Sequence, residues 1–414
     1  MSSLLLTDIK CLVGTHDADT LLLRGGSMTN LPVIEDAWLL VENGLIKDFG
    51  KMGDGLPSPI SNLTTQISAQ GKFILPCWCD SHTHLVFAAS REEEFVMKIK
   101  GQSYEEIAAA GGGILNSARK LGLASEDELF NSAYSRLHEL IKLGTGAIEI
   151  KSGYGLTAES ELKMLRVIRR LKEVAPIPVK ATFLGAHAYP SEFKNDHEGY
   201  LKLLIKELIP QIAGESLADY IDVFCEQGFF SVDETSRILE VGAKFGLKPK
   251  IHANQLSATG AVETAVKHLA LSVDHLEVMD ERAIESLANS STIATVLPSC
   301  SLFLGIPFAD ARKLLRQNIA VALASDFNPG STPSGNMNLV VSLACMRLKM
   351  LPEEAINAAT LNGAAAMEMS HSHGSITRGK AANFFITKPI PSLAYLPYSF
   401  GSNHIESVYI NGNG

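Results

Sequence analysis

The chain has 414 residues, of which 46% are hydrophobic, and a formal net charge of -9. This length supports a large buried core, and the acidic balance without a dense lysine and arginine cluster argues against a nucleic-acid-binding surface. No apolar run approaches the ~20 residues that cross a bilayer, and no export signal opens the chain, so we expect a cytoplasmic protein with no membrane partner.

The six cysteines are scattered and form neither a CxxC pair nor a disulfide framework. Their distribution also predicts a reduced, cytoplasmic setting. Cys77 and Cys79 flank Trp78 and can in principle form a thiolate site, although free cysteine commonly behaves as a small buried hydrophobic residue.

The two ends of the chain have the same character. The first 72 residues contain short apolar segments joined by polar turns, and Asn43-Gly44 between two such segments predicts a β-hairpin. Similar segments return in 379–386 and 407–412. We therefore predict a small composite β-sandwich domain of residues 1–72 and 377–414, with a second domain of residues 73–376 inserted between its halves.

The second domain begins with the apolar run Phe73–Phe87, which contains His82 and His84. Side chains alternate faces along a strand, so the two imidazoles project from one side and converge on a point that suits a divalent metal ion. Asp80 has the same parity and is expected to orient an imidazole. A His-x-His pair alone is more often two unrelated histidines, so the metal interpretation depends on the rest of the chain.

Strand-like and helical segments then alternate. Ser125 with Glu128 is a capping-box pattern that begins a helix. Ser231 with Glu234 repeats it, and Thr157 begins an amphipathic run. The strands expected after the first are 145–150, 179–184, 220–224, 249–253, 270–275, 292–298 and 319–324. Eight strands, each followed by a helix, predict an α/β fold of the (β/α)8 TIM-barrel type rather than a doubly wound sheet.

Catalytic groups of such barrels lie at the C-terminal ends of the strands. The polar residues that end the expected strands are His82, His84, Lys151, Tyr154, His187, Glu226, His252, His275, Ser299 and Asp326. Taken singly, His252 or Asp326 fits a structural role equally well. Together with His82 and His84 they form a shell of three imidazoles and one carboxylate, which suits one zinc or iron ion better than magnesium or calcium.

Several sequence blocks resemble the amidohydrolase superfamily in its mononuclear form. These blocks are 75–84, His252, Ser325-Asp326, 360–366 and 374–383. Within the superfamily, longer blocks are similar to the imidazolonepropionase family: 82–87 with 90–92, 110–114, 149–156, 182–188, 222–226 and 325–331.

This resemblance implies a metal-dependent hydrolase that acts on a C–N bond of a cyclic amide. The implied reaction opens 4-imidazolone-5-propanoate to N-formimidoyl-L-glutamate with a metal-activated water, the third step of histidine degradation to glutamate. It implies one divalent or trivalent metal ion per subunit, zinc or iron. The implied ligands are His82, His84, His252 and Asp326. His275 and Asp326 are the implied catalytic residues, which stabilise the oxyanion or move protons.

The implied substrate is a small molecule with a carboxylate side chain. Arg91 is the candidate for holding that carboxylate, because a guanidinium group binds it bidentately. The structural alternative for Arg91 is a surface ion pair with one of Glu92 to Glu94. By resemblance, the other substrate-binding residues are Tyr104, Tyr154, His187, Gln255, Asn328, Gly330 and Ser331.

Gln255 departs from the pattern of some family members, which carry at this position a glutamate with a role in activating water. Glutamine cannot take a proton, so we expect Gln255 to position substrate and either His275 or Asp326 to act as the base. Milder departures that can alter the packing of the pocket are Cys77, Trp78 and Ala89.

Two rival functions use the same barrel. A purine or pyrimidine deaminase often places a glutamate near His252, so Gln255 counts against it, and Arg91 favours a carboxylate-bearing substrate. A catalytically silent scaffold typically lacks metal ligands, whereas all four are present here. We expect a homodimer, the commonest assembly of such enzymes.

Overall fold

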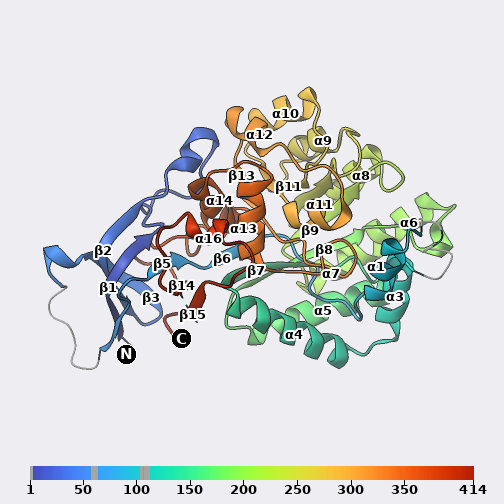
Figure 1. Ribbon diagram of the computed structural model, residues 1–414. Coiled ribbons are helices and arrows are strands. Elements are labelled where there is room, and N and C mark those ends of the chain that lie inside the picture. The colour runs from blue at the N-terminus through green and yellow to red at the C-terminus, as the bar shows by residue number, and fades with distance from the viewer. Residues whose placement is uncertain (1–2, 57–63, 103–105, 107–111) are drawn as a thin grey trace.

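The structure is a computed structural model that describes residues 3–56, 64–102, 106 and 112–414. Within these ranges the strands form two sheets, a seven-stranded sheet A and an eight-stranded sheet B. Figure 1 shows sheet A on one side of the molecule and sheet B, surrounded by helices, on the other. No helix of the described residues is long and apolar enough to cross a membrane.

Sheet A joins strands from both ends of the chain. Its order is β15-β14-β5-β1-β2-β3, and β4 pairs with β1. The strands are β1 (Ser3–Val13), β2 (Val33–Glu42), β3 (Leu45–Lys51), β4 (Thr65–Ser68), β5 (Phe73–Pro76), β14 (Phe384–Thr387) and β15 (Ile405–Tyr409). The hairpin predicted at Asn43-Gly44 is confirmed, because β2 and β3 pair antiparallel across these two residues, which both have positive φ. The domain boundaries after residue 72 and before residue 377 stay predictions.

Sheet B confirms the predicted barrel. Its strands pair in parallel in chain order from β6 to β13. They are β6 (Trp78–Asp80), β7 (Thr145–Lys151), β8 (Val179–Ala186), β9 (Tyr220–Cys225), β10 (Lys248–Ala253), β11 (Ser272–His275), β12 (Ile293–Val296) and β13 (Val321–Leu323). Each is followed by at least one helix, as the sequence predicts.

The helices begin at the expected caps. Ser125 and Ser231 form capping boxes with Glu128 and Glu234, and Thr157 caps the helix that follows it. The α-helices are α1 (Glu92–Ile99), α3 (Ile114–Leu123), α4 (Glu126–Lys142), α5 (Ala158–Val174), α6 (His197–Leu203), α7 (Ile209–Gly214), α8 (Val232–Lys244), α9 (Ala261–Lys267), α10 (Glu281–Ala288), α11 (Pro298–Leu304), α12 (Ala311–Arg316), α13 (Met337–Met346), α14 (Pro352–Ala359), α15 (Leu361–Ala365) and α16 (Tyr395–Tyr398). Shorter turns are η1 (Gly25–Thr29), η2 (Met52–Asp54), η3 (Ser191–Phe193) and the π-helical η4 (Leu204–Leu208).

The apolar run that was expected to be one strand is divided at Cys77. β5 belongs to sheet A and β6 to the barrel, so the chain changes sheets between them. Trp78 fills this junction: its ring lies 5.1 Å from that of Phe385, and its indole N–H donates to Asn338 Oδ1 at 3.2 Å. Burial raises the pKa of Cys79 to about 12 and that of Cys77 well above its usual range. Neither thiol belongs to a group of potential metal ligands among the described residues, which disfavours a thiolate site here.

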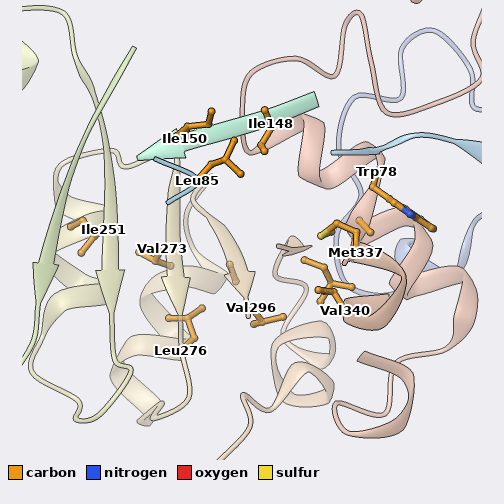
Figure 2. Close-up of a cluster of buried hydrophobic side chains, with 14 of the residues drawn as sticks. Trp78, Leu85, Ile148, Ile150, Ile251, Val273, Leu276, Val296, Met337 and Val340 are labelled. Atoms are coloured by element: carbon orange, nitrogen blue, oxygen red, sulfur yellow. The ribbon is translucent and has the colours of Figure 1, made fainter. Parts of the chain in front are cut away.

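The barrel strands place apolar side chains outside and charged side chains inside. Figure 2 shows part of the outer set, Ile148, Ile150, Ile251, Val273 and Val296, in one cluster with Met337 and Val340 of helix α13. In β7 the intervening residues are Glu149 and Lys151, which point the opposite way because strand side chains alternate. Lys151 reaches Asp274 on the non-neighbouring strand β11, with 3.5 Å between Nζ and Oδ2, so these groups meet inside the barrel.

Candidate metal centre

The barrel closes where the sequence predicts the metal ligands. Backbone hydrogen bonds join the segments after β6 and β13: Asp326 N donates to His82 O at 3.0 Å, and His84 N donates to Phe327 O at 2.8 Å. Thr83 and Phe327 form an isolated parallel bridge at the same seam. The first and last strands of the barrel therefore bring Asp326 next to both histidines.

The side chains at this seam converge on one space. Asp326 Oδ1 lies 3.5 Å from His82 Nε2 and 3.7 Å from His84 Nε2. The ring of His252, at the end of β10, has its centroid 4.5 Å from that of His82 and 5.6 Å from that of His84. His82, His84 and Asp326 can supply donor atoms within 4.8 Å of one another, and so can His82, His252 and His275.

Each of the three predicted histidine ligands is oriented through its other ring nitrogen. Asp274 Oδ2 lies 2.7 Å from His82 Nδ1, and Asp222 Oδ2 lies 3.0 Å from His252 Nδ1. His84 Nδ1 lies 3.4 Å from the Ser152 carbonyl oxygen. These contacts leave the Nε2 atoms for a ligand.

His82 Nε2 is buried without a hydrogen-bond partner. A buried polar atom without a partner is costly, and a cation at this point removes that cost. Burial also holds the pKa values of His82 and His84 well below the usual range, so both imidazoles are neutral at pH 7, as metal ligation requires. The donor set thus fits a divalent metal ion.

The expectation that Asp80 orients an imidazole is wrong. Its carboxylate accepts hydrogen bonds from Ser325 N at 3.0 Å and from Ser325 Oγ at 2.6 Å. Asp80 therefore helps to hold the segment that leads to Asp326. Asp80 does alternate in step with His82 and His84 along the chain, but this alternation does not predict its partner. Closure of the barrel decides which group lies opposite Asp80.

We call the end of the barrel where His82, His84, His252, His275 and Asp326 converge the rim. A layer of ion pairs lies inside the barrel beneath it. We call it the charged layer, and its members are Glu149, Lys151, Asp222, Lys250 and Asp274, each at most 1% exposed. Lys151 Nζ donates to Asp222 Oδ2 at 2.9 Å and lies 3.5 Å from Asp274 Oδ2. One ammonium group therefore connects the two carboxylates that orient His252 and His82.

Glu149 completes the charged layer. Its Oε1 accepts from Lys151 Nζ at 2.6 Å and from Thr182 Oγ1 at 2.6 Å, and its Oε2 pairs with Lys250 Nζ. Burial opposes the charge of Lys151, but the carboxylates of Asp222, Glu149 and Asp274 outweigh this effect and raise its pKa above the usual range. Lys151 is thus charged, and the members of the charged layer are paired with one another.

His275 ends β11 with an unusual backbone. Its φ is 89° and that of Leu276 is 69°, in the left-handed region. His275 Nδ1 lies 3.7 Å from Glu277 Oε1, and Ser301 Oγ donates to the same oxygen at 3.0 Å. Burial lowers the pKa of His275, but Glu277, Asp326 and Asp274 together raise it by more, so the net shift is upward. The pKa of His275 thus shifts in the opposite direction to those of His82 and His84.

Arg91 lies beside the loop that follows Asp326. Its Nε donates to Glu94 Oε2 at 2.9 Å, so the ion pair considered as an alternative exists. A Cβ atom on Gly330 would collide with Arg91 Nη1, so the guanidinium group also approaches this loop closely. Glu94 in turn accepts from Gly113 N at 3.0 Å. The ion pair fixes Arg91 next to the loop rather than on an open surface.

Asn328 organises that loop. Its Oδ1 accepts from Gly330 N at 2.8 Å and Ser331 N at 2.7 Å. Ser331 Oγ lies 3.1 Å from Asp326 Oδ2, and Tyr154 OH donates to Asn328 Oδ1 at 3.3 Å. The loop residues predicted to bind substrate therefore lie together, next to the carboxylate of the metal shell.

The rings of Tyr154 and His187 both lie against His84. The ring of His187 stacks on His84 with 5.5 Å between centroids, and the ring of Tyr154 lies 5.6 Å from that of His84. His187 Nδ1 lies 2.9 Å from the carbonyl oxygen of Gly153. The buried carboxylate of Glu161 accepts from the N–H groups of Gly153, Gly155 and Leu156, which fixes the loop that carries Tyr154.

Gln255 contacts Cys300 of α11, with 3.5 Å between Gln255 Nε2 and Cys300 Sγ. Burial, with a further contribution from Asp326, raises the pKa of Cys300 well above its usual range. Glu226 ends β9 and accepts from Leu256 N at 2.9 Å, so it orders the segment after Gln255. Tyr104 lies outside the described residues.

The sequence reasoning missed the charged layer, Glu161, Glu277 and Cys300. A signal for the charged layer was present, since charged residues alternate with apolar ones in Ile148-Glu149-Ile150-Lys151 and in Val273-Asp274. A parallel strand covered by helices is normally apolar on both faces. The alternation therefore indicates a polar barrel interior.

The sequence profile of the Amidohydrolase family matches residues 73–413. An imidazolonepropionase of Christiangramia forsetii is 58% identical over 410 residues, which are 99% of this chain and 99% of that protein. An imidazolonepropionase of Flavobacterium johnsoniae is 54% identical over 99% of this chain and 98% of its own length, and one of Geobacillus kaustophilus is 40% identical over 93% and 91%.

Solved structures share the fold at low sequence identity. The E. coli guanine deaminase superposes with a TM-score of 0.75 at 13% identity, over 100% of this chain and 98% of the other. A triazine hydrolase variant superposes with a TM-score of 0.75 at 16% identity, over 99% and 94%. At such identities the likeness concerns the architecture alone.

Proposed function

Because this chain belongs to the amidohydrolase family, and its relatives at 40–58% identity are imidazolonepropionases, we infer that it is a hydrolase of a cyclic amide C–N bond. The reaction is the hydrolytic opening of 4-imidazolone-5-propanoate to N-formimidoyl-L-glutamate, a step of histidine degradation. This function rests on the extent of the identity to these relatives. The structure supports it, because potential metal donors lie together at the rim and Arg91 approaches the loop that follows Asp326.

We propose that His82, His84, His252 and Asp326 hold one metal ion, zinc or iron. In support, burial keeps the imidazoles of His82 and His84 neutral. Asp274, Asp222 and the Ser152 carbonyl group orient His82, His252 and His84. When bound, such an ion lowers the pKa of a coordinated water toward ~7 and polarises a carbonyl group.

His275 and Asp326 are the groups proposed to move protons. Asp326 accepts hydrogen bonds from Ser331 and Thr332 through Oδ2, while Oδ1 faces His82 and His84. It therefore lies where it can receive a proton from the attacking water and pass it to the departing ring nitrogen. The carboxylate of Glu277 supports the protonated form of His275, which can stabilise the oxyanion.

Arg91 is proposed to bind the propionate group of the substrate. Glu94 occupies Nε and Nη2, and Nη1 points toward the loop of Gly330. Tyr154 and His187 then contact the substrate ring, and Gln255 and the loop of Asn328, Gly330 and Ser331 bind its polar groups. Tyr104 is retained as a further substrate contact from the sequence resemblance. The carboxamide of Gln255 cannot accept a proton, so the base is assigned to Asp326 or His275.

A ring-opening assay tests this function. Purified protein is offered 4-imidazolone-5-propanoate and, separately, guanine and related bases. We expect turnover of the imidazolone alone, and its loss in His252→Ala. Deamination of a purine without ring opening would contradict the proposal. A metal content near zero that added zinc or iron does not restore would favour the scaffold function instead. A homodimer and a cytoplasmic location are proposed on the sequence alone.

A further inference from the structure

A second group of possible metal ligands lies beside the first. Donor atoms of His275, Glu277 and Cys300 all lie within 4.8 Å of one another, and these residues are 2%, 8% and 0% exposed. The group shares His275 with the rim, whereas Glu277 and Cys300 occur in no other such group among the described residues. We propose that these three side chains form a second cation site, which takes a thiophilic divalent ion such as Cd²⁺ or excess Zn²⁺.

Two buried atoms of this group have no hydrogen-bond partner. They are His275 Nδ1 and Glu277 Oε2, and neither is satisfied by a neighbouring side chain or backbone group. His275 Nδ1 lies 3.7 Å from the other oxygen of Glu277, which is too long for a hydrogen bond. Buried polar atoms are rarely left without a partner. The two unpartnered atoms therefore indicate that a ligand binds at this point.

Three structural elements place the donors. The positive φ angles of His275 and Leu276 turn the chain after β11, which brings Glu277 beside His275. Cys300 lies in the first turn of α11, one residue before Ser301, whose hydroxyl group donates to Glu277 Oε1 at 3.0 Å. The site is therefore built by rigid elements of the barrel and not by an exposed loop.

The donor atoms determine which ion fits. A thiolate combined with an imidazole and a carboxylate suits Zn²⁺ and Cd²⁺, whereas Mg²⁺ and Ca²⁺ take shells of oxygen atoms. The shell proposed at the rim has no sulfur donor. A bound ion that contacts sulfur therefore reports the second site specifically.

Occupation of this site has a defined chemical balance. The S–H bond of Cys300 breaks and a sulfur–metal bond forms, while protonated His275 loses its extra proton as its ring nitrogen becomes a ligand; both protons leave to the buffer, with no oxidation or reduction. The imidazole of His275 becomes a ligand and no longer transfers a proton. Inhibition of ring opening by a second ion follows, and this consequence rests on the proposed function, whereas binding itself does not.

The test is a titration of the full chain, first loaded with one equivalent of zinc, with Cd²⁺ in a thiol-free reductant. Three quantities are followed: the ultraviolet charge-transfer absorption of a cadmium–thiolate bond, the zinc and cadmium content after desalting, and ring-opening activity. We expect one equivalent of cadmium to bind without release of zinc, the thiolate absorption to appear in parallel, and activity to fall.

Variants locate the site. Cys300→Ser is expected to abolish the thiolate absorption, and Glu277→Gln to weaken cadmium binding at least tenfold. The control is Cys225→Ser, a buried cysteine on β9 outside the group, which keeps the absorption and the second equivalent. Thermal unfolding of each zinc-loaded variant shows that it is folded.

Three outcomes overturn the second site: no thiolate absorption in the wild type, full absorption in Cys300→Ser, or cadmium that merely replaces zinc. Binding with the thiolate signal but undiminished ring opening leaves the site in place and contradicts the role of His275 in proton transfer. A preparation that binds both ions but never opens the imidazolone ring contradicts the proposed function alone.

Discussion

The rim and the charged layer belong to the same barrel and share strands β10 and β11, yet they differ in how their charges are satisfied. In the charged layer, Lys151 and Lys250 pair with Glu149, Asp222 and Asp274, and no member is more than 1% exposed. At the rim, His82 Nε2 and His275 Nδ1 have no hydrogen-bond partner among the described residues. The protein thus completes its ion pairs below the site and leaves donor atoms open at the rim. We therefore assign binding to the rim and orientation of the imidazoles to the charged layer.

The largest expected effect comes from removing a rim donor. His252→Ala deletes an imidazole that Asp222 orients, with Nδ1 3.0 Å from Oδ2. We expect loss of bound metal and of ring opening to background, which metal analysis and the assay measure together. A variant that keeps stoichiometric metal and turnover would contradict the assignment of His252.

Lys151→Met tests the charged layer. It leaves Asp222 and Asp274 without the ammonium group between them. We expect metal affinity to fall by roughly 10- to 100-fold, since groups that orient ligands have effects of this size. The free energy of unfolding should fall by about 3–5 kcal/mol, because a buried ion pair loses one partner. Chelator competition and denaturant unfolding measure the two effects.

The matched control is Lys250→Met. Lys250 pairs with Glu149 and donates to the Ser81 carbonyl oxygen, and it forms no ion pair with the carboxylates that orient the imidazoles. We expect a comparable loss of stability but a smaller loss of metal affinity. If both variants lose metal affinity to the same extent, orientation by Lys151 is not the cause.

Arg91→Ala tests the substrate side of the rim. Loss of a charge-assisted hydrogen bond costs about 1.5–3 kcal/mol, so we expect KM to rise by roughly 10- to 100-fold with metal content unchanged. Arg119→Ala serves as the control, because Arg119 pairs with Asn116 on the exposed face of α3. An unchanged KM would mean that the ion pair with Glu94 is the whole role of Arg91.

Acid should affect the rim before the charged layer. Burial lowers the folded-state pKa values of His82 and His84, so the unfolded chain binds more protons than the folded one below about pH 6.5. In metal-free protein the free energy of unfolding should therefore fall as the pH drops from about 7 to about 5. His84→Gln should reduce this slope, and an unchanged slope would contradict the assignment to the rim.

Asp222 is expected to lose its contribution to stability in a different pH range. Burial raises its pKa, but His252 and Lys151 lower it by more, so its folded-state pKa lies below the usual value. Its contribution is present above its unfolded-state pKa of about 3.9 and is lost only at lower pH. Asp222 should therefore keep its pairs with His252 and Lys151 between about pH 7 and about pH 5, the range in which proton uptake by the unfolded chain at His82 and His84 lowers the stability.

The smallest effect is expected from Trp78→Phe. Trp78 packs against Phe385 and donates to Asn338 at the junction between the sheets, and Figure 2 shows it beside α13. We expect the free energy of unfolding to fall by about 1–2 kcal/mol, with kinetic constants and metal content unchanged. A changed KM would show that this departure from the family pattern reaches the pocket.

The rim was accessible to sequence reasoning because strand ends of a barrel share one face. His82, His252, His275 and Asp326 each lie at or just after the end of a predicted strand, and counting eight such strands placed these ends on one face of the barrel. The roles assigned to them stay predictions, but their proximity is a property of the structure.

The remainder depended on contacts that no local pattern specifies. Asp80 was assigned to an imidazole by parity, but closure of the barrel places it against Ser325. Asp274 lies within a predicted strand, and only the three-dimensional arrangement shows that Lys151 approaches it from β7. The role of Glu161 could not be predicted from the local sequence either, because its partners are backbone N–H groups of a loop that precedes its helix.

The most direct test of the account is an anomalous difference map at the absorption edge of zinc, from crystals of protein loaded with one equivalent. The account predicts a single peak per chain within coordination distance of His82, His84, His252 and Asp326, with Asp222 and Asp274 still hydrogen-bonded to their imidazoles. A peak elsewhere would contradict this assignment. So would a peak at these ligands with the hydrogen bonds from Asp222 and Asp274 to the imidazoles broken.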